Sequence, residues 1–409
     1  MGESLCTGVV CFGGQDWWYH NHSHVDLQLM RCYASRVTTL YINSIVMQKP
    51  VLKVGNNLVK KIVRKSKSVF AGLKRTEFGF WVHSPCTLPV HHVSALSRLN
   101  NGLLKIQIRH SLKKLHIENP IVWVVCPVAC RAALQMQKEK LIYLRTDAYE
   151  EFPNVDVDVV KKYDQKLKAC ADLTIFANRS LYEEEHNQCK EAIYLDHGVD
   201  YEFFATADSI VSVPLEIADV PKPIVGFFGE ISDYTVDIEL LDKVIDCLPE
   251  KSFVFVGEVV ADCSRFSTKK NVFMLGRKPY EQIPHYGKCF DVAIMPWRQN
   301  RWIQVCNPIK LKEYLALGKP IVSTPFAELQ KYQDLVYQAT NPTTFAMCIN
   351  RAILENNPDL AAKRKDRVRN DSWEQRARAV LPELFELPDS PHARFTIADC
   401  LLPIKNRRS

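Results

Sequence analysis

No uninterrupted apolar stretch in the sequence approaches the roughly 18 residues that a membrane-spanning helix needs. Residues 1–12 also lack the basic flank and the long apolar core of a secretory signal peptide. The 14 cysteines contain no Cys-x-x-Cys pair, and Cys126 and Cys130 have no second pair with which to bind zinc. From these absences we expect a protein that does not cross a membrane and that keeps its cysteines as free thiols in the cytosol.

Short apolar runs alternate with amphipathic segments along the chain. Its 409 residues exceed the roughly 250–300 that one hydrophobic core organises, so two domains are expected. The spacing of the runs suits βα units, because parallel strands need crossovers of this size. The expected strands are 8–12, 37–42, 78–82, 120–125, 140–144, 173–177 and 192–195 in the first half, and 224–228, 253–256, 272–275, 292–295 and 320–323 in the second.

A proline-containing segment of weak periodicity separates the two halves, and we predict a linker there, at 205–223. The predicted organisation is an N-terminal domain over 1–204 and a C-terminal domain over 224–371, followed by a helix and tail over 372–409 that return toward the N-terminal domain. The predicted fold class is α/β, with two Rossmann-like doubly wound domains facing across a cleft, where ligands bind beyond the carboxyl ends of the strands.

The strongest motif of the chain lies at 307–322. Asn307 and Pro308 are a suitable N-cap and first helical residue. The exposed N–H groups and positive dipole of a helix start suit a diphosphate, and Lys310 adds a full positive charge in the first turn. Glu313 lies one turn further on, where it can accept hydrogen bonds from ribose hydroxyls, and Gly318 ends the helix. The alternative is an ordinary capped helix packed on the sheet.

This motif resembles the donor-nucleotide signature of the GT-B glycosyltransferases. Further similar segments are 119–123, 141–143, 195–200, 226–229, 275–280 and 291–296. The resemblance covers nearly the whole chain and is to the bacterial cell-surface group, namely the family 4 or group 1 polysaccharide glycosyltransferases of teichuronic acid type and the xanthan glucuronosyltransferase.

The resemblance implies an acceptor-binding N-terminal domain and a C-terminal domain that binds a nucleotide sugar, UDP- or GDP-linked, with no other cofactor. Glycine at position 229 would let the backbone approach a phosphate closely. The donor-binding residues that the resemblance implies are Gly229, Arg277, Arg298, Asn307, Lys310 and Glu313.

One position departs from this family. Retaining family 4 enzymes carry an acidic residue eight positions before the glutamate matched by Glu313, and here that position is Val305. An inverting transfer needs a carboxylate that deprotonates the acceptor hydroxyl. Asp147 follows an expected strand, and the resemblance to the xanthan enzyme implies that its segment supplies the base. Asp147 is therefore the predicted catalytic base, with a helix N-cap or loop aspartate as the alternative.

Other polar residues lie where expected strands end. The acceptor-side candidates are Gly13, Gly14, Asp16 and His83, although a structural role for His83 is an equal alternative. Arg298 and Arg301 are candidates to stabilise the departing diphosphate alongside Lys310, with a solvated loop as the alternative.

No metal site is expected. The spacing of His20, His22 and His24 is compatible with a metal cluster, but no matching acidic or cysteine partners follow, and a loop at the acceptor site is the alternative. No Asp-x-Asp pair stands out as a ligand set. Basic side chains would then supply the positive charge that a divalent cation supplies in other transferases.

Two basic segments predict contact with an anionic membrane. From 49 to 75 there are nine Lys or Arg residues and no Asp or Glu, and 103–117 places four basic residues among seven Leu or Ile residues. Such segments bind anionic lipid, although a solvated helix face is the alternative. No nucleic-acid-binding module accompanies the charge. We expect a cytoplasmic protein that is peripheral on the inner membrane face and whose acceptor is lipid-linked.

The leading hypothesis is a metal-independent glycosyltransferase that extends a lipid-linked or polysaccharide acceptor in cell-surface glycan synthesis. Non-hydrolysing nucleotide-sugar epimerases share the architecture and are the alternative among enzymes. A non-catalytic donor-binding scaffold protein is the alternative outside enzymes, because the acidic residue is missing at Val305.

Overall fold

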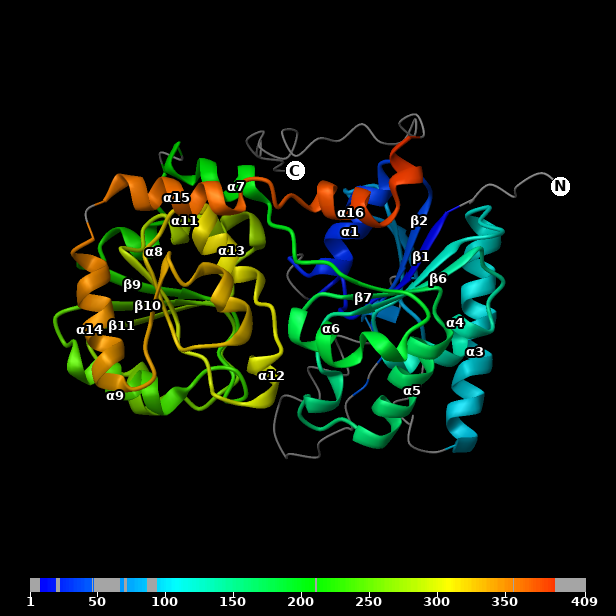
Figure 1. The fold of residues 1–409 in the computed structure, drawn as a ribbon, viewed down its shortest axis with the longest axis horizontal. Helices are drawn as coiled ribbons and strands as arrows, with labels where there is room; N and C mark the ends of the chain where they lie inside the picture. The colour runs from blue at the N-terminus through cyan, green and yellow to red at the C-terminus, as the bar shows by residue number, and fades with distance from the viewer. Residues whose placement is uncertain are drawn as a thin grey trace, which may run out of the picture.

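The computed structural model describes residues 8–19, 23–45, 47, 67–69, 72–86, 94–209, 212–355 and 357–386. Two α/β domains lie side by side, one formed by the N-terminal half of the chain and the other by most of the C-terminal half (Figure 1). None of the helices in this described part combines the length and the apolar character needed to cross a membrane.

The N-terminal domain is built on a sheet that has, within the described residues, eight strands in the order β3-β4-β2-β1-β5-β6-β7-β8. All neighbours pair in parallel except β3 and β4, which are antiparallel. The central strands are buried on both faces, which is why they appear in the sequence as continuous apolar runs. The strands are β1 (Val9–Phe12), β2 (Thr39–Ile42), β3 (Leu73–Arg75), β4 (Trp81–His83), β5 (Ile121–Val124), β6 (Lys140–Arg145), β7 (Leu173–Phe176) and β8 (Ala192–Tyr194).

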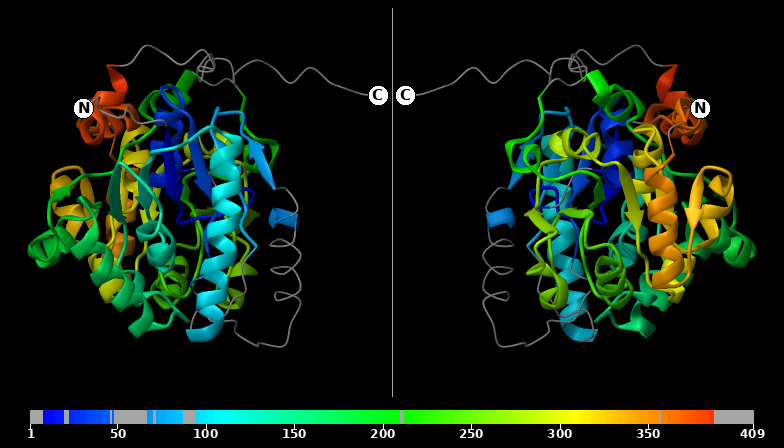
Figure 2. Two further views of the ribbon diagram at one scale, coloured as in Figure 1. Left: turned by 90° about the vertical axis from the view of Figure 1, so that its right-hand side faces the viewer. Right: turned by 90° about the vertical axis from the view of Figure 1, so that its left-hand side faces the viewer.

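Helices cover both faces of this sheet. Alternate residues of β1 point to opposite faces, so that Val9 and Cys11 pack with α1 (Val25–Ala34), while Val10 and Phe12 pack in the cluster that includes α3 (Ser94–Lys114). The long helix α3 lies on the outer side of the domain (Figure 2). Other helices in the described part of this half are α4 (Cys130–Leu134), α5 (Val157–Cys170) and α6 (Arg179–Glu185).

The C-terminal sheet is parallel, with described strands in the order β11-β10-β9-β12-β13-β14. The strands are β9 (Ile224–Phe228), β10 (Ser252–Val256), β11 (Val272–Gly276), β12 (Val292–Met295), β13 (Ile321–Ser323) and β14 (Val336–Gln338). The helices are α9 (Ile238–Cys247), α10 (Ser264–Ser267), α11 (Ile283–Gly287), α12 (Arg301–Gln304), α13 (Ile309–Ala316), α14 (Pro342–Ile353) and α15 (Pro358–Val368).

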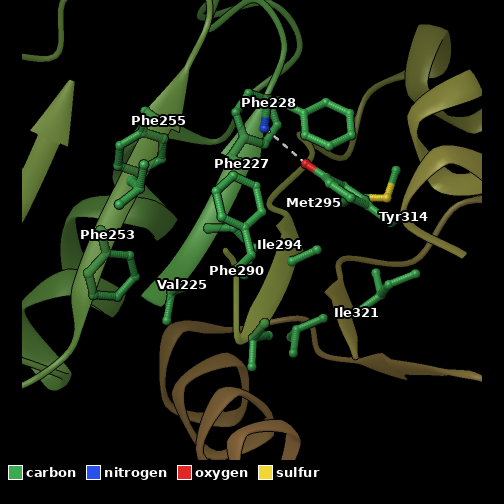
Figure 3. Packing of buried hydrophobic residues seen from close by; sticks show 14 of the residues in the cluster. Val225, Phe227, Phe228, Phe253, Phe255, Phe290, Ile294, Met295, Tyr314 and Ile321 are labelled. Atoms are coloured by element: carbon green, nitrogen blue, oxygen red, sulfur yellow. Dashed lines mark hydrogen bonds between the residues drawn. The ribbon is translucent and has the colours of Figure 1, made fainter. Parts of the chain in front are cut away.

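Aromatic side chains fill the core of the C-terminal domain around β9 and β10 (Figure 3). Gly226 lets Phe290 pack directly on β9, because a Cβ at Gly226 would lie 2.1 Å from the ring of Phe290. The backbone N–H of Phe228 donates to the hydroxyl of Tyr314 at 3.0 Å. This bond and the surrounding rings fix α13 against the carboxyl end of β9.

The chain crosses between the domains twice. The first crossing follows β8 and leads to α7 (Tyr201–Ala205) and α8 (Leu215–Ala218), which pack on the C-terminal domain (Figure 1). The second leads from α15 to α16 (Trp373–Val380), which packs against α1 (Figure 1). The Tyr33 hydroxyl donates to the carbonyl of Ala377 at 3.1 Å, so α16 completes the core of the N-terminal domain.

Each strand expected from an apolar run coincides with an observed strand to within a few residues. Two short strands, β3 and β14, were not expected, and both lie at a sheet edge. The basic segment 49–75 lies mostly outside the described residues. Its last residues, Leu73–Arg75, form the strand β3 and not part of an amphipathic helix, whereas the segment 103–117 falls largely on α3.

Candidate active site between the two domains

Glycines mark the carboxyl ends of neighbouring strands in the C-terminal sheet. Gly229 follows β9 with φ 136°, and Gly276 ends β11 with φ 67°. A Cβ on Gly257, after β10, would lie 1.8 Å from the carbonyl oxygen of Gly229, so these two loops approach as closely as only glycine permits. Ligands of doubly wound sheets bind beyond this edge.

Lys310, in the first turn of α13, extends toward the Gly229 loop. Its half-buried ammonium lies 5.3 Å from the ring centroid of Phe227 and 4.8 Å from that of Trp297, and 2.5 Å from where a Cβ on Gly229 would lie. Burial lowers the pKa of Lys310, and the nearby Glu313 opposes this effect. A cation held beside a glycine turn is suited to binding a diphosphate.

Glu313 lies one turn along α13 and is buried. The Tyr280 hydroxyl donates to its Oε1 at 3.3 Å. Burial raises the pKa of Glu313 to about 7, against the opposing charge of Lys310. This carboxyl group therefore changes its charge near neutral pH, and its predicted contact with ribose stays a prediction.

The N-cap of α13 is Pro308, so the prediction that Asn307 caps the helix is wrong by one position. The side-chain amide of Asn307 instead donates to the carbonyl of Ala177 and to the carboxylate of Asp196, each at 2.8 Å. Both partners belong to the N-terminal domain. Asn307 thus joins the two domains at the start of the donor motif.

The predicted arginines differ in their surroundings. Arg277 and Arg298 are exposed on the loops after β11 and β12, and their predicted donor contacts stay predictions. Arg301, on α12, pairs with Glu184 of α6. Its charge therefore already has a partner in the N-terminal domain, which does not favour the predicted role of stabilising the leaving group.

Val305 is buried between the domains, with 1% of its surface exposed. It packs in an apolar cluster with Ala148, Phe176 and Leu181, all from the N-terminal domain. A carboxylate at this position would lose its hydration among these side chains. The residue that replaces the acidic residue of retaining relatives thus forms part of the domain interface.

Asp147 follows β6 and is half-buried at the domain boundary. The neighbouring residue Ala148 packs against Val305. The charge of Asp147 adds to the effect of burial in raising the pKa of the Cys306 thiol. Burial raises the pKa of Asp147 itself, and His24 is the largest opposing influence. The following short helix has Ala148 as its N-cap, so Asp147 is not the helix cap. Its predicted role as the catalytic base stays a prediction.

Sequence reasoning missed the contact between His24 and Asp26. The Nδ1 atom of His24 lies 2.6 Å from Oδ1 of Asp26, which is fully buried in the first turn of α1. The sequence alone suggests a metal cluster or an acceptor-site loop for His24 together with His20 and His22, and those two histidines lie outside the described residues. The available signal was an acidic residue flanked by Val25 and Leu27, where the core side of a helix would otherwise be apolar.

The acceptor-side candidates organise the loop after β1. The N–H of Gly14 donates to Oδ2 of Asp26 at 2.7 Å, and a Cβ on Gly13 would lie 1.9 Å from the ring of Tyr41. The carboxylate of Asp16 accepts hydrogen bonds within the protein, from the N–H of Trp18 at 3.0 Å and the hydroxyl of Ser68 at 3.0 Å. These contacts give Gly13, Gly14 and Asp16 structural roles, whereas their predicted acceptor contacts stay predictions.

His83 ends β4, and its imidazole interacts with α3. Its Nδ1 lies 3.3 Å from the hydroxyl of Ser111 on that helix. Burial lowers the pKa of His83, and His110 adds to this effect. Its predicted acceptor role stays a prediction. Among the residues with described positions, no group of three or more His, Cys, Asp or Glu could hold a metal ion.

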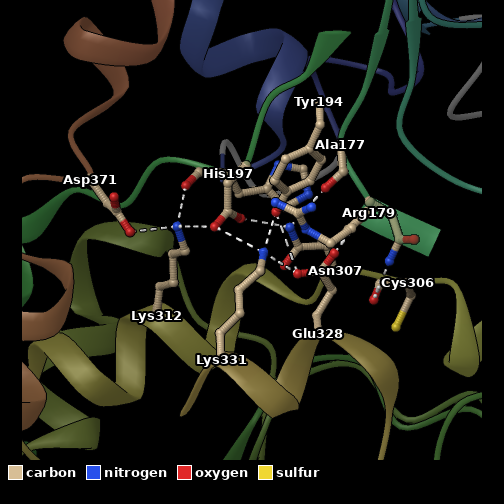
Figure 4. Close-up of polar contacts among 12 residues, drawn as sticks. Ala177, Arg179, Tyr194, His197, Cys306, Asn307, Lys312, Glu328, Lys331 and Asp371 are labelled. Atoms are coloured by element: carbon tan, nitrogen blue, oxygen red, sulfur yellow. Dashed lines mark hydrogen bonds and ion pairs between the residues drawn. The ribbon is translucent and has the colours of Figure 1, made fainter. Parts of the chain in front are cut away.

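A polar network joins the two domains beside α13 (Figure 4). The ammonium of Lys312 donates to the carboxylate of Asp371 and to the carbonyl of His197, each at 2.6 Å, and lies 3.2 Å from Asp196. Lys331 lies 3.3 Å from the same carboxylate. Burial alone would raise the pKa of Asp196, but Lys312 and Lys331 hold it well below its ordinary value. The ion pairs of these lysines with Asp196 and Asp371 thus hold the two domains together beside the candidate site.

Two facing Rossmann-like domains, with the last described helix returning to the first domain, define the GT-B architecture. Residues 222–355 match the family described as "Glycosyl transferases group 1". This match lies within the C-terminal domain, and the fold of the whole chain is GT-B.

Among curated proteins, the chain is distantly similar to the "Putative teichuronic acid biosynthesis glycosyltransferase TuaH" of Bacillus subtilis, with 24% identity over 228 residues. That match spans 53% of this chain and 57% of the relative, so it covers little more than half the length of either protein.

Solved structures show the same fold. A sucrose-phosphate synthase from Thermosynechococcus elongatus has a TM-score of 0.67 at 12% identity, with 93% of this chain and 98% of that one covered. The Anabaena protein HepE, in complex with UDP and glucose, has a TM-score of 0.65 at 13% identity, with 93% and 100% covered.

Proposed function

We propose that this protein transfers a sugar from a nucleotide diphosphate donor to a lipid-linked or polysaccharide acceptor in cell-surface glycan synthesis. The observation that carries the proposal is the position of Lys310 beside the Gly229 turn. Val305, just before this motif, packs against Ala148, the neighbour of Asp147. The match of residues 222–355 to the group 1 family supports a nucleotide-sugar donor, and the distant relative in teichuronic acid biosynthesis supports a cell-surface product.

The proposed chemistry divides between the domains. Asp147 takes the proton of the acceptor hydroxyl while that oxygen attacks the anomeric carbon, and the bond from this carbon to the diphosphate oxygen breaks. Lys310 and the start of α13 stabilise the charge that develops on the diphosphate, without a metal ion. Attack from the side opposite the leaving group inverts the anomeric configuration. The buried, apolar environment of Val305 supports this pathway, because it provides no carboxylate near the donor sugar.

A mass-spectrometric screen of UDP- and GDP-linked sugars against membrane lipid extract tests the function. We expect one donor to be consumed together with formation of a glycosylated lipid, with an inverted anomeric configuration by NMR. Asp147→Asn should lower turnover by about 10²–10⁴ while leaving nucleotide affinity nearly unchanged. Donor turnover without acceptor would instead identify an epimerase, and nucleotide binding without turnover would identify a scaffold protein.

We also propose that the protein works at an anionic membrane surface on the cytoplasmic side. The outer face of α3 supports this proposal, because Leu103 and Ile106 are 41% and 68% exposed and the basic residues Arg109, Lys113 and Lys114 are exposed further along the helix. Exposed apolar side chains beside basic ones suit the boundary between lipid headgroups and acyl chains.

A further inference from the structure

A buried hydrogen bond joins α13 to the short helix η5 (Tyr280–Gln282), which follows β11. The hydroxyl of Tyr280 donates to Oε1 of Glu313 at 3.3 Å, and both side chains are buried. This bond engages one of the two carboxyl oxygens, and the second oxygen, Oε2, can accept from a ligand. Tyr280 thus holds a buried carboxyl group on the same helix that carries Lys310 in its first turn.

Aromatic packing holds the ring of Tyr280 in turn. Its centroid lies 5.7 Å from that of Phe203 and 6.0 Å from that of Phe204, both on α7. The ring of Phe204 also stacks with that of Phe228 at the end of β9, with centroids 6.4 Å apart. These rings fix the direction in which the Tyr280 hydroxyl points. Loss of the hydroxyl alone would leave this packing in place.

The position of Glu313 on α13 relates its carboxyl group to a bound nucleotide. Glu313 and Lys310 are three residues apart, so they share one face of the helix and are displaced by about 4.5 Å along its axis. Lys310 lies beside the Gly229 turn, where the diphosphate is proposed to bind. In a nucleoside diphosphate the ribose follows the phosphates, and its two free hydroxyls donate hydrogen bonds. A carboxylate one turn along the helix is suited to accept them.

We propose that Tyr280 is a positioning residue of the donor site: its hydroxyl holds the Glu313 carboxylate in the orientation that accepts hydrogen bonds from the ribose of the nucleotide. The inference rests on the proposed function, in which a nucleotide diphosphate binds beside Lys310. Tyr280 acts through Glu313 and does not itself touch the donor. A bond that only fixed α13 against η5 would affect every nucleotide alike, so the two roles differ in their dependence on the ribose hydroxyls.

The charges around this pair give the contact a pH dependence. Burial raises the pKa of Glu313 to about 7, and Lys310 and then the Tyr280 hydroxyl oppose this effect. Loss of the hydroxyl should therefore raise the pKa of Glu313 further and leave less ionised carboxylate at neutral pH. The titratable or charged groups around the pair are Lys310 and Tyr314 on α13, Asp200 at the start of α7 and Arg31 on α1.

Calorimetry with UDP, GDP and their 2′,3′-dideoxy analogues tests the proposal without requiring sugar transfer. At pH 7 we expect Tyr280→Phe to bind the ribonucleotide roughly three- to tenfold more weakly than the wild type, because one hydrogen bond to a charged group is lost. The dideoxy analogue has the same base and diphosphate, and its affinity should not change. At pH 9 the deficit should shrink, because the carboxylate is ionised again. Tyr286→Phe is the matched control: it loses a hydroxyl that donates to Glu216 at 2.7 Å in the same domain, and it should change neither affinity.

A second variant assigns the effect to the carboxylate. Glu313→Gln should reduce the preference for the ribonucleotide over its dideoxy analogue by roughly tenfold. Adding Tyr280→Phe to it should cost nothing further, because the hydroxyl then has no carboxylate to hold. If Tyr280→Phe alone does not fold, Glu313→Gln still tests the contact, and an unchanged ribose preference in it would overturn the proposal.

The remaining outcomes are equally decisive. Equal losses for the ribonucleotide and the dideoxy analogue in Tyr280→Phe would give Tyr280 a purely structural role. An unchanged affinity for the ribonucleotide would remove Tyr280 from the donor site. If the wild-type protein binds neither UDP nor GDP, the proposed function fails and the inference fails with it, and this outcome is distinguishable because it appears before any variant is made.

Discussion

At the scale of single residues, Lys310 has the clearest predicted consequence. Its ammonium lies beside the Gly229 turn and over the rings of Phe227 and Trp297. We expect Lys310→Ala to weaken nucleotide diphosphate binding roughly ten- to a hundredfold, because a charge-assisted hydrogen bond contributes about 1.5–3 kcal/mol. Calorimetry on the folded variant measures this change. The exposed Lys270→Ala is a matched control, and equal affinities of both variants would remove the diphosphate from this helix.

Glu313 gives a pH-dependent prediction at the same scale. Because burial raises its pKa to about 7, folding favours the protonated carboxyl, and the stability that this provides is present at acid pH and lost as pH rises toward and above 7. We expect Glu313→Gln to stabilise the nucleotide-free protein at pH 8 by about 1–3 kcal/mol, and to change stability little at pH 4.5. Urea unfolding at both pH values measures this difference. A variant that is equally destabilised at both would mean that Glu313 is ionised and well paired.

At the scale of elements, α3 is the described part of the proposed membrane surface. We expect the combined change of Arg109, Lys113 and Lys114 to Gln to weaken binding to anionic liposomes on the order of a hundredfold, since each basic residue near the surface contributes about 1 kcal/mol. Salt should have a similar effect. Neutralising Arg265, Lys270 and Lys363 of the C-terminal domain removes the same charge elsewhere. If both triple variants sediment alike, α3 is not the contact.

The strands that are buried on both faces were predictable from the sequence, because they need apolar residues throughout. β1 and β9 are buried throughout and appear as apolar runs. β3 carries only Leu73 among basic residues and β14 spans three residues, because an edge strand pairs on one side and needs little burial. The donor motif was likewise local, since Lys310 and Glu313 lie on one helix.

Contacts between distant segments were not predictable in this way. Nothing in the sequence near Asn307 shows that its amide bonds to Asp196, or that Val305 packs against Ala148. The pairing of His24 with Asp26 is close in sequence, but the Gly14 N–H and the Tyr41 hydroxyl that share this carboxylate come from other parts of the sheet. These contacts in the N-terminal half of the candidate site could therefore be identified only in the folded structure.

At the scale of the whole molecule, Val305 lies in the domain interface at a position that bears on the proposed reaction pathway. Simple restoration of the missing acidic residue would place a carboxylate among Ala148, Phe176 and Leu181. We expect Val305→Glu to lower the free energy of unfolding at pH 8 by on the order of 3–5 kcal/mol, because the buried charge has no partner in this cluster. We do not expect it to convert an inverting transfer into a retaining one.

The neutral variant Val305→Gln separates charge from polarity in this experiment. Both variants lose apolar packing, but only the glutamate must ionise, and burial raises its pKa above the value in the unfolded chain. The stability gap between the two should therefore be small near pH 4.5 and should widen as pH rises, because the unfolded glutamate releases its proton first. Urea unfolding across this range measures the gap. Equal stabilities at every pH, or a product with retained configuration from Val305→Glu, would show that this side chain reaches the donor sugar instead of the apolar interface.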